Sequence, residues 1–95
     1  MKAIRFHEFG APGVLRYEDA PKPAVRPGEV LVRVHAAGLN PPDWYLREGY
    51  KALPPEWRPP IELPAIPGSD VSGIVEAVAP DVTAFSPGDE VFGMI

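Results

Sequence analysis

The sequence contains no cysteine. This absence excludes disulfide bonds and thiolate metal sites, but a chain without cysteine tolerates any redox environment, so the compartment stays open. Long apolar runs are also missing: no stretch approaches the roughly 20 residues that cross a bilayer, and residues 1–7 alternate instead of forming a signal peptide. We therefore expect a cytoplasmic protein with no membrane partner.

Clusters of basic residues are missing as well. The 9 Lys and Arg and the 13 Asp and Glu are interspersed along the chain and give a formal net charge of −4. A nucleic-acid-binding surface needs a concentrated positive patch, usually with aromatic side chains among the basic ones. The charge pattern therefore predicts no nucleic-acid partner.

Proline, in contrast, is abundant. The chain has 14 prolines in 95 residues and is 45% hydrophobic, and such a proline content lies far above the average of about 5%. This length allows at most one small domain, so we treat residues 1–95 as a single domain in which extended structure dominates.

Alternation of side chains predicts the strands. Residues 30–36 place four apolar side chains on one face, which is typical of a half-buried strand, and Pro-Gly pairs mark turns between the extended stretches. The expected strands cover residues 3–7, 15–18, 30–36, 73–78 and 90–95. Short strands with Pro-Gly corners predict a mainly β, partly open barrel.

One short helix is expected over residues 41–48. Asn40 is the predicted N-cap, Pro41 takes the first helical position, and Gly49 ends the helix. Asp43 lies one turn before Arg47, a spacing at which opposite charges interact. The proline-rich stretch 50–67 shows no periodicity, and we expect it to form a cleft wall or lid.

Four motifs follow one another in a characteristic order. They are residues 26–34 (RPGEVLVRV), 38–49 (GLNPPDWYLREG), 67–75 (PGSDVSGIV) and 85–91 (FSPGDEV). Together they resemble the N-terminal catalytic domain of the medium-chain dehydrogenase/reductase superfamily, in its zinc-independent, quinone-oxidoreductase-like branch. The resemblance covers all 95 residues, implies a GroES-like fold, and implies that the family's nucleotide-binding Rossmann domain is absent from this chain.

The resemblance also bears on metals and cofactors. In the zinc-dependent branch a cysteine occupies the position of Asn40, and a Gly-His-Glu triplet occupies that of Gly68-Ser69-Asp70, so no metal is expected. The implied cofactor is NADPH. The chain has no Gly-x-Gly-x-x-Gly cradle, and the Gly68 to Gly73 spacing is not followed by a P-loop lysine. We therefore expect the missing Rossmann domain to bind most of the cofactor.

Candidate site residues follow from the same resemblance. It places Asn40 beside the nicotinamide, as a catalytic and cofactor-binding residue, and Tyr45 in the substrate cleft as the second catalytic candidate. Tyr50 and Asp70 are candidates for substrate binding. Structural roles remain open for all of them: a helix cap, a core aromatic, an exposed loop side chain and a turn residue, respectively.

For three further residues the sequence supports only a core or surface position: His35, Trp44 and Trp57. The predicted function is that of the substrate-facing domain of a zinc-independent NAD(P)H oxidoreductase that transfers hydride to a small-molecule quinone or activated enone. Homo-oligomers would form through the missing domain, and the 95 residues alone are expected to be inactive. The alternative is a free-standing, non-catalytic GroES-like interaction module or an inactive truncated remnant.

Overall fold

The computed structural model describes all residues from Met1 to Ile95. Its contacts group them into two compact units: unit 1 contains residues 1–21 and 39–68, and unit 2 contains residues 22–38 and 69–95. The two units interleave in sequence, so the chain crosses between them after residues 21, 38 and 68.

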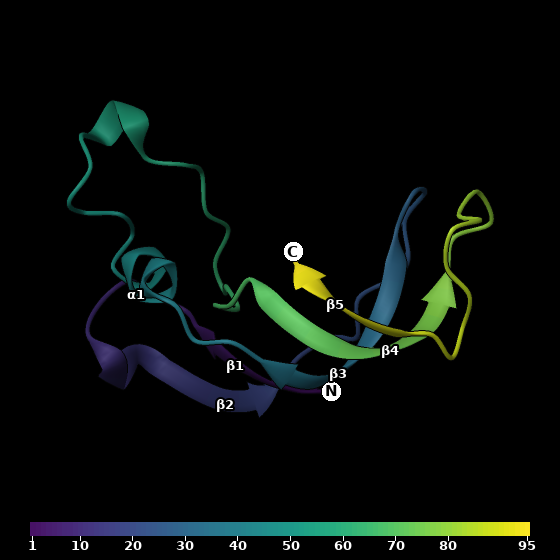
Figure 1. Ribbon diagram of the computed structural model, residues 1–95. Helices are drawn as coiled ribbons and strands as arrows, with labels where there is room; N and C mark the ends of the chain where they lie inside the picture. The colour runs from purple at the N-terminus through teal and green to yellow at the C-terminus, as the bar shows by residue number, and fades with distance from the viewer. The chain divides into compact units, whose positions relative to one another are not determined.

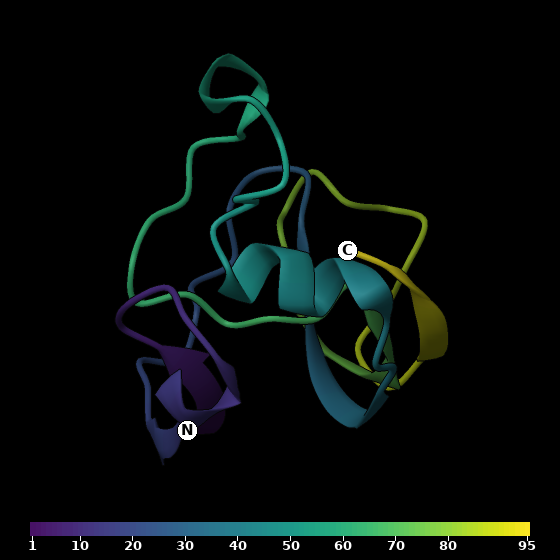
Figure 2. The ribbon, with the colours of Figure 1, turned by 90° about the vertical axis from the view of Figure 1, so that its left-hand side faces the viewer.

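Unit 1 combines a two-stranded ribbon with the helix. Strands β1 (Lys2–Phe6) and β2 (Leu15–Asp19) pair antiparallel and are joined through a 3₁₀ turn, η1 (Pro12–Val14). Helix α1 spans Pro41–Arg47, and a second 3₁₀ turn, η2, spans Pro55–Trp57. Figure 2 shows the chain leaving α1, passing through η2 and returning as an open loop.

Helix α1 begins where the sequence predicted and ends one residue earlier, at Arg47. Asn40 is its extended N-cap (φ −135°, ψ 156°) and Pro41 its first residue, while Gly49 lies just beyond the helix with φ 71°. The Asn40 backbone N–H donates to the Asp43 carboxylate at 2.9 Å, within a capping box. This arrangement satisfies backbone groups that a helix start would otherwise leave without partners.

The interaction expected between Asp43 and Arg47 is not formed. Asp43 is held in the cap, and the Arg47 guanidinium donates instead to the Gly10 carbonyl at 3.0 Å. The Gly10 N–H in turn donates to the Arg47 carbonyl at 3.0 Å. The last turn of α1 is therefore tied to the loop after β1.

An aromatic core lies under this junction. Phe6 is fully buried, and its ring centroid lies 6.2 Å from that of Phe9. The Phe9 ring covers Gly49 so closely that a Cβ there would lie 3.0 Å from it. Phe6 and Ala65 exchange two backbone hydrogen bonds of 3.0 Å, which hold the end of the proline-rich stretch against β1.

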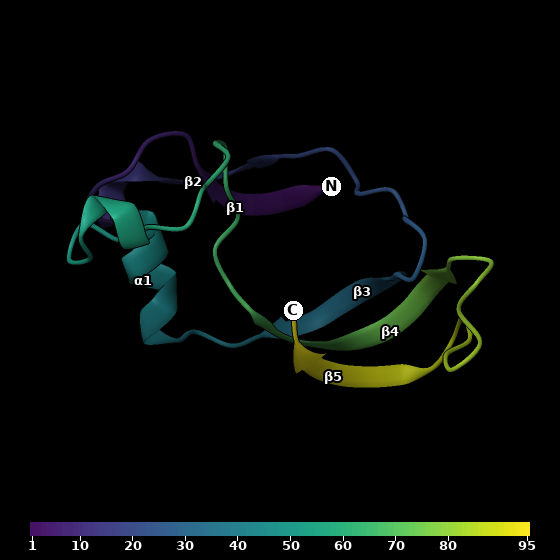
Figure 3. The same cartoon turned by 90° about the horizontal axis from the view of Figure 1, so that it is seen from above.

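Unit 2 is a three-stranded antiparallel sheet in the order β3-β4-β5 (Figures 1 and 3). The strands are β3 (Val30–Ala37), β4 (Asp70–Val78) and β5 (Glu90–Met94). All the expected strands are present, and β4 begins earlier than predicted. The chain is thus mainly β with one short α-helix and with sheets that do not close, which confirms the predicted class. No helix is long and apolar enough to span a membrane.

The strict alternation of buried and exposed side chains predicted for β3 is wrong over the whole strand. Only Val30–Val32 is half-buried, and the rest of the strand is exposed, including Val34 at 52%. The pairing with β4 shifts between Leu31 and Val32 and again between Val34 and Ala36. Such register shifts move the following side chains to the other face, so a simple period of two cannot describe the strand.

Between these shifts, β4 lies close against β3 at Gly73. Gly73 pairs with Val34 and is buried. A Cβ at this position would collide with the Arg33 carbonyl and would come within 2.9 Å of the Val32 side chain. Because the obstacle is backbone, it cannot turn aside as a flexible side chain would.

Gly73→Ala is therefore expected to lower the free energy of unfolding by about 1–3 kcal/mol, the usual range for overpacking. Urea denaturation of the purified protein measures this change. Gly93→Ala on β5 is the matched control, because a Cβ there meets nothing within 4 Å. Equal stability of the two variants would contradict the close approach at Gly73.

A charged cluster stabilises the β1–β2 ribbon in unit 1. The Arg5 guanidinium donates to the Glu18 carboxylate at 2.6 Å, and the His7 ring bonds the same carboxylate oxygen. The hydrogen bond from His7, followed by that from Arg5, lowers the pKa of Glu18 below its ordinary value of 4.5. Both partners thus favour the ionised form of Glu18.

The pH dependence follows from the sign of this shift. A carboxyl whose pKa is lower in the folded state stabilises the fold above its unfolded-state pKa, and the gain is lost as the pH falls through the folded pKa. Glu18→Gln should therefore flatten the loss of stability between pH 5 and about pH 3, measured by urea unfolding. Glu62→Gln is the control, because Glu62 is exposed and outside these ion pairs, and it should leave the pH dependence of stability unchanged. If wild type and Glu18→Gln show the same pH dependence, the charged cluster does not stabilise the ribbon.

Candidate functional site

Asn40 lies at the start of α1, at the beginning of the second segment of unit 1. It is half-buried, and its capping role is confirmed by the box that it forms with Asp43. The chemical role beside a nicotinamide is not tested by this geometry and stays a prediction. The cap fixes the backbone of Asn40, which is a condition for any positioning role of its amide.

Tyr45 lies on the same helix and is 41% exposed. It is therefore a surface aromatic and not a core one. Its ring contacts that of Trp44, with 4.3 Å between the centroids and an interplanar angle of 56°. The Tyr45 carbonyl accepts a hydrogen bond from the Tyr50 N–H at 2.8 Å, so the exit of the helix brings the two tyrosines' backbones together.

Tyr50 has a left-handed backbone, with φ 55°, directly after Gly49. Glycine adopts this conformation freely, but a bulky residue does so at a cost of about 1–2 kcal/mol. Hydrogen bonds on both sides hold it there: Tyr50 donates to Tyr45, and Leu53 donates to the Tyr50 carbonyl at 2.9 Å. The predicted role of Tyr50 in substrate binding is not tested by this geometry and stays a prediction.

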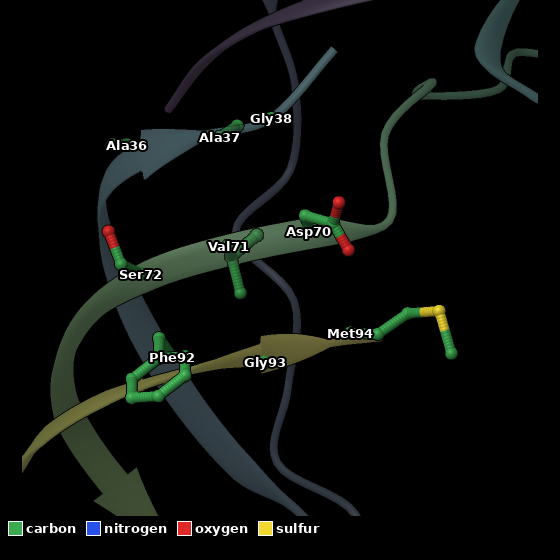
Figure 4. A pocket seen from close by; sticks show the side chains of 9 residues that line it. All are labelled: Ala36, Ala37, Gly38, Asp70, Val71, Ser72, Phe92, Gly93 and Met94. Atoms are coloured by element: carbon green, nitrogen blue, oxygen red, sulfur yellow. The ribbon is translucent and has the colours of Figure 1, made fainter. Parts of the chain in front are cut away.

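Asp70 belongs to unit 2, as the first residue of β4. Its carbonyl accepts from the Gly38 N–H at 3.0 Å, and it pairs with Met94 across the sheet. Asp70 lines an open hollow of about 490 Å³, whose other residues are mainly small or apolar and come from the three strands and Gly38. Figure 4 shows the Asp70 carboxylate, with Phe92 and Met94 on the β5 side. Sequence reasoning gave no reason to place Phe92 and Met94 there, since it fixed no register between β4 and β5.

Neither metal nor phosphate ligands gather at the start of α1. No group of three or more His, Asp or Glu side chains is close enough to hold a metal ion. The first two residues of the helix, Pro41 and Pro42, have no backbone N–H. A helix start holds phosphate through such N–H groups, so the first two positions of this one offer none to a phosphate.

Comparison with known proteins assigns the family. Residues 26–95 match the model of the alcohol dehydrogenase GroES-like domain, and the chain belongs to this family. The resemblance to quinone oxidoreductases of the medium-chain dehydrogenase/reductase type is thereby confirmed, as is the GroES-like fold.

The similar proteins are mainly quinone oxidoreductases. The chain is 46% identical over 93 residues to the quinone oxidoreductase of Rattus norvegicus, covering 97% of the chain and 26% of the relative. A mycobacterial protein solved with NADPH is 44% identical, with a TM-score of 0.84, over 99% of the chain and 27% of that protein. Escherichia coli quinone oxidoreductase with NADPH is 32% identical, with a TM-score of 0.83, over 97% and 26%. The chain thus spans about a quarter of the length of these relatives.

Paired substitutions test the backbone of Tyr50. Tyr50→Gly and Tyr50→Ala remove the same ring, but only alanine keeps a Cβ in the left-handed conformation. The glycine variant should therefore be the more stable by about 1 kcal/mol, measured by chemical denaturation, in reverse of the usual order. If the alanine variant is as stable as the glycine variant, Tyr50 does not hold this conformation in solution.

Proposed function

We propose that residues 1–95 form a single N-terminal, substrate-facing domain of a zinc-independent, NADPH-dependent oxidoreductase that reduces a quinone or an activated enone. The observation that carries this proposal is the α1 segment: the N-cap residue Asn40, the exposed ring of Tyr45 and the strained backbone of Tyr50 lie on one short stretch of unit 1. Similarity to quinone oxidoreductases over nearly the whole chain supports the proposed reaction class.

When bound, NADPH supplies the hydride for such a reduction. The residues of this chain contribute position: a neutral amide at Asn40 can hydrogen-bond the uncharged part of the cofactor, and the tyrosine ring offers a surface for an apolar acceptor. Asp43 is held in the cap, and Glu48 pairs with Lys51 at 3.3 Å. Neither carboxylate is placed as a proton donor.

Most of the cofactor must be held by other parts of the longer protein. The α1 start offers no N–H groups at its first two positions, and the chain has no glycine-rich phosphate cradle. The two relatives solved with NADPH support the choice of this cofactor. The absence of zinc is part of the same proposal, because Asn40 and Ser69 are weak ligands.

The alternative of a free-standing interaction module is less well supported. The buried apolar residues are few: Phe6, Ala20, Val75 and Ala79. Large apolar side chains are exposed instead, such as Leu39 at 94% and Phe92 at 89%. A domain of this size needs more buried surface to offset its conformational entropy, which favours a part of a larger fold. Three expectations stay predictions: a cytoplasmic location, the lack of nucleic-acid and membrane partners, and homo-oligomers that form through a Rossmann domain.

Asn40 variants of the full-length protein test the function. The wild type should oxidise NADPH in the presence of a quinone or enone and should contain no stoichiometric zinc by metal analysis. Asn40→Ala should lower turnover while costing only about 1 kcal/mol of stability through the lost cap. Asn40→Asp is the matched control for the cap, because aspartate caps equally well but brings a charge.

Both variants should therefore be slower than the wild type, with Asn40→Asp the more stable of the two. Wild-type rates in both would reduce Asn40 to a cap alone. One tightly bound zinc per chain, or no acceptor-dependent oxidation of NADPH by the wild type, would refute the proposed function.

A further inference from the structure

The rings of Trp44 and Tyr45 touch although the two residues are consecutive on α1. Adjacent side chains on a helix leave the axis about 100° apart and do not normally face each other. Here the centroids are 4.3 Å apart, with the planes tilted by 56°. The two side chains therefore fold toward one another and form one aromatic surface with two tilted faces.

This surface is open. Trp44 is 45% exposed and Tyr45 41% exposed, whereas Phe6 in the other aromatic pair of unit 1 is fully buried. That other pair, Phe6 and Phe9, already supports the end of α1 through Gly49. The helix is further fixed by its cap and by Arg47, so the fold of unit 1 does not need a large aromatic side chain at position 44.

The surface also lies close to the proposed chemistry. Trp44 is the fourth residue of the short helix that Asn40 caps, so the two residues lie within about one turn of each other along the chain. We propose that Trp44 is a specificity-determining residue, whose indole stacks against the conjugated ring of a flat, electron-poor acceptor, with the tilted Tyr45 ring beside it. This inference rests on the proposed function and narrows its substrate class to ring quinones over small enones.

The physical reason is the charge distribution of the rings. The face of an indole or phenol ring is electron-rich, and aromatic pairs attract in offset or tilted arrangements. The carbonyl groups of a quinone withdraw electrons from its ring, so its face complements that of Trp44. A small enone has one short conjugated segment and offers far less area for this contact.

Kinetics of the full-length protein with two acceptors test the proposal. Trp44→Leu should raise the KM for naphthoquinone roughly 3- to 10-fold and change that for cyclohexenone much less. Trp44→Phe, which keeps a ring, should recover most of the loss. Trp57→Leu is the matched control, because Trp57 is the only other tryptophan of this chain, lies on η2 and is 71% exposed. This variant should leave the KM values for both acceptors unchanged.

A binding measurement without NADPH separates stacking from turnover. Naphthoquinone should quench the tryptophan fluorescence of the wild type and of Trp57→Leu, and the Trp44→Leu variant should lose most of this quenching. An equal effect of Trp44→Leu on both acceptors, or unchanged quenching, overturns the proposal. So does a lower unfolding midpoint with unchanged selectivity, because Trp44 would then pack against another part of the protein. If the wild type reduces neither acceptor, the proposed function fails, and the quenching still decides the stacking.

Discussion

The close approach of two backbones at Gly73 is the constraint on which unit 2 depends. Strand β4 can lie against the Arg33 carbonyl only because residue 73 has no side chain. The register of β3 shifts on both sides of this point. Strand β5 then pairs with β4 over residues 70–74, so the position of Asp70 and of the hollow beside it follows from the same contact.

In unit 1, the structure depends on the contacts that hold helix α1 in place. A helix of seven residues has no stability of its own in water, because its few internal hydrogen bonds cannot offset the cost of nucleation. Its place depends on the capping box, on the Arg47–Gly10 bonds and on Phe9 beneath Gly49. Residues that are distant in sequence from the proposed site, such as Phe9, therefore help to determine where Asn40 and Tyr45 lie.

Local chemistry explains what the sequence could predict. Alternation and Pro-Gly turns located the strands, and the Asn-Pro start with Gly49 at the end located α1. The shifts along β3 depend on the partner strand, which no local pattern contains. The same is true of Arg47, whose partner Gly10 lies 37 residues away, and of the division into two interleaved units. For the site, only the cap of Asn40 could be derived from the residues. The role of Tyr45 came from resemblance, and that of Tyr50 from its place directly after Gly49. No local pattern predicted the left-handed backbone of Tyr50 or the ring contact between Trp44 and Tyr45.

The hydrogen bond between the Gly38 N–H and the Asp70 carbonyl closes the base of the excursion from residue 39 to residue 68. The chain leaves and re-enters unit 2 at neighbouring points of one sheet, where Ala37 pairs with Val71. A segment with such fixed ends can change in length and composition at little cost to the sheet, because closing a longer loop adds little entropy. The segment from residue 39 to residue 68, which carries Asn40, Trp44, Tyr45 and Tyr50, can therefore vary without disturbing the sheet of unit 2. On the proposed function, a change in this segment would change acceptor preference without disturbing the sheet, provided that its anchors to residues 1–21, Arg47 and Ala65, are kept.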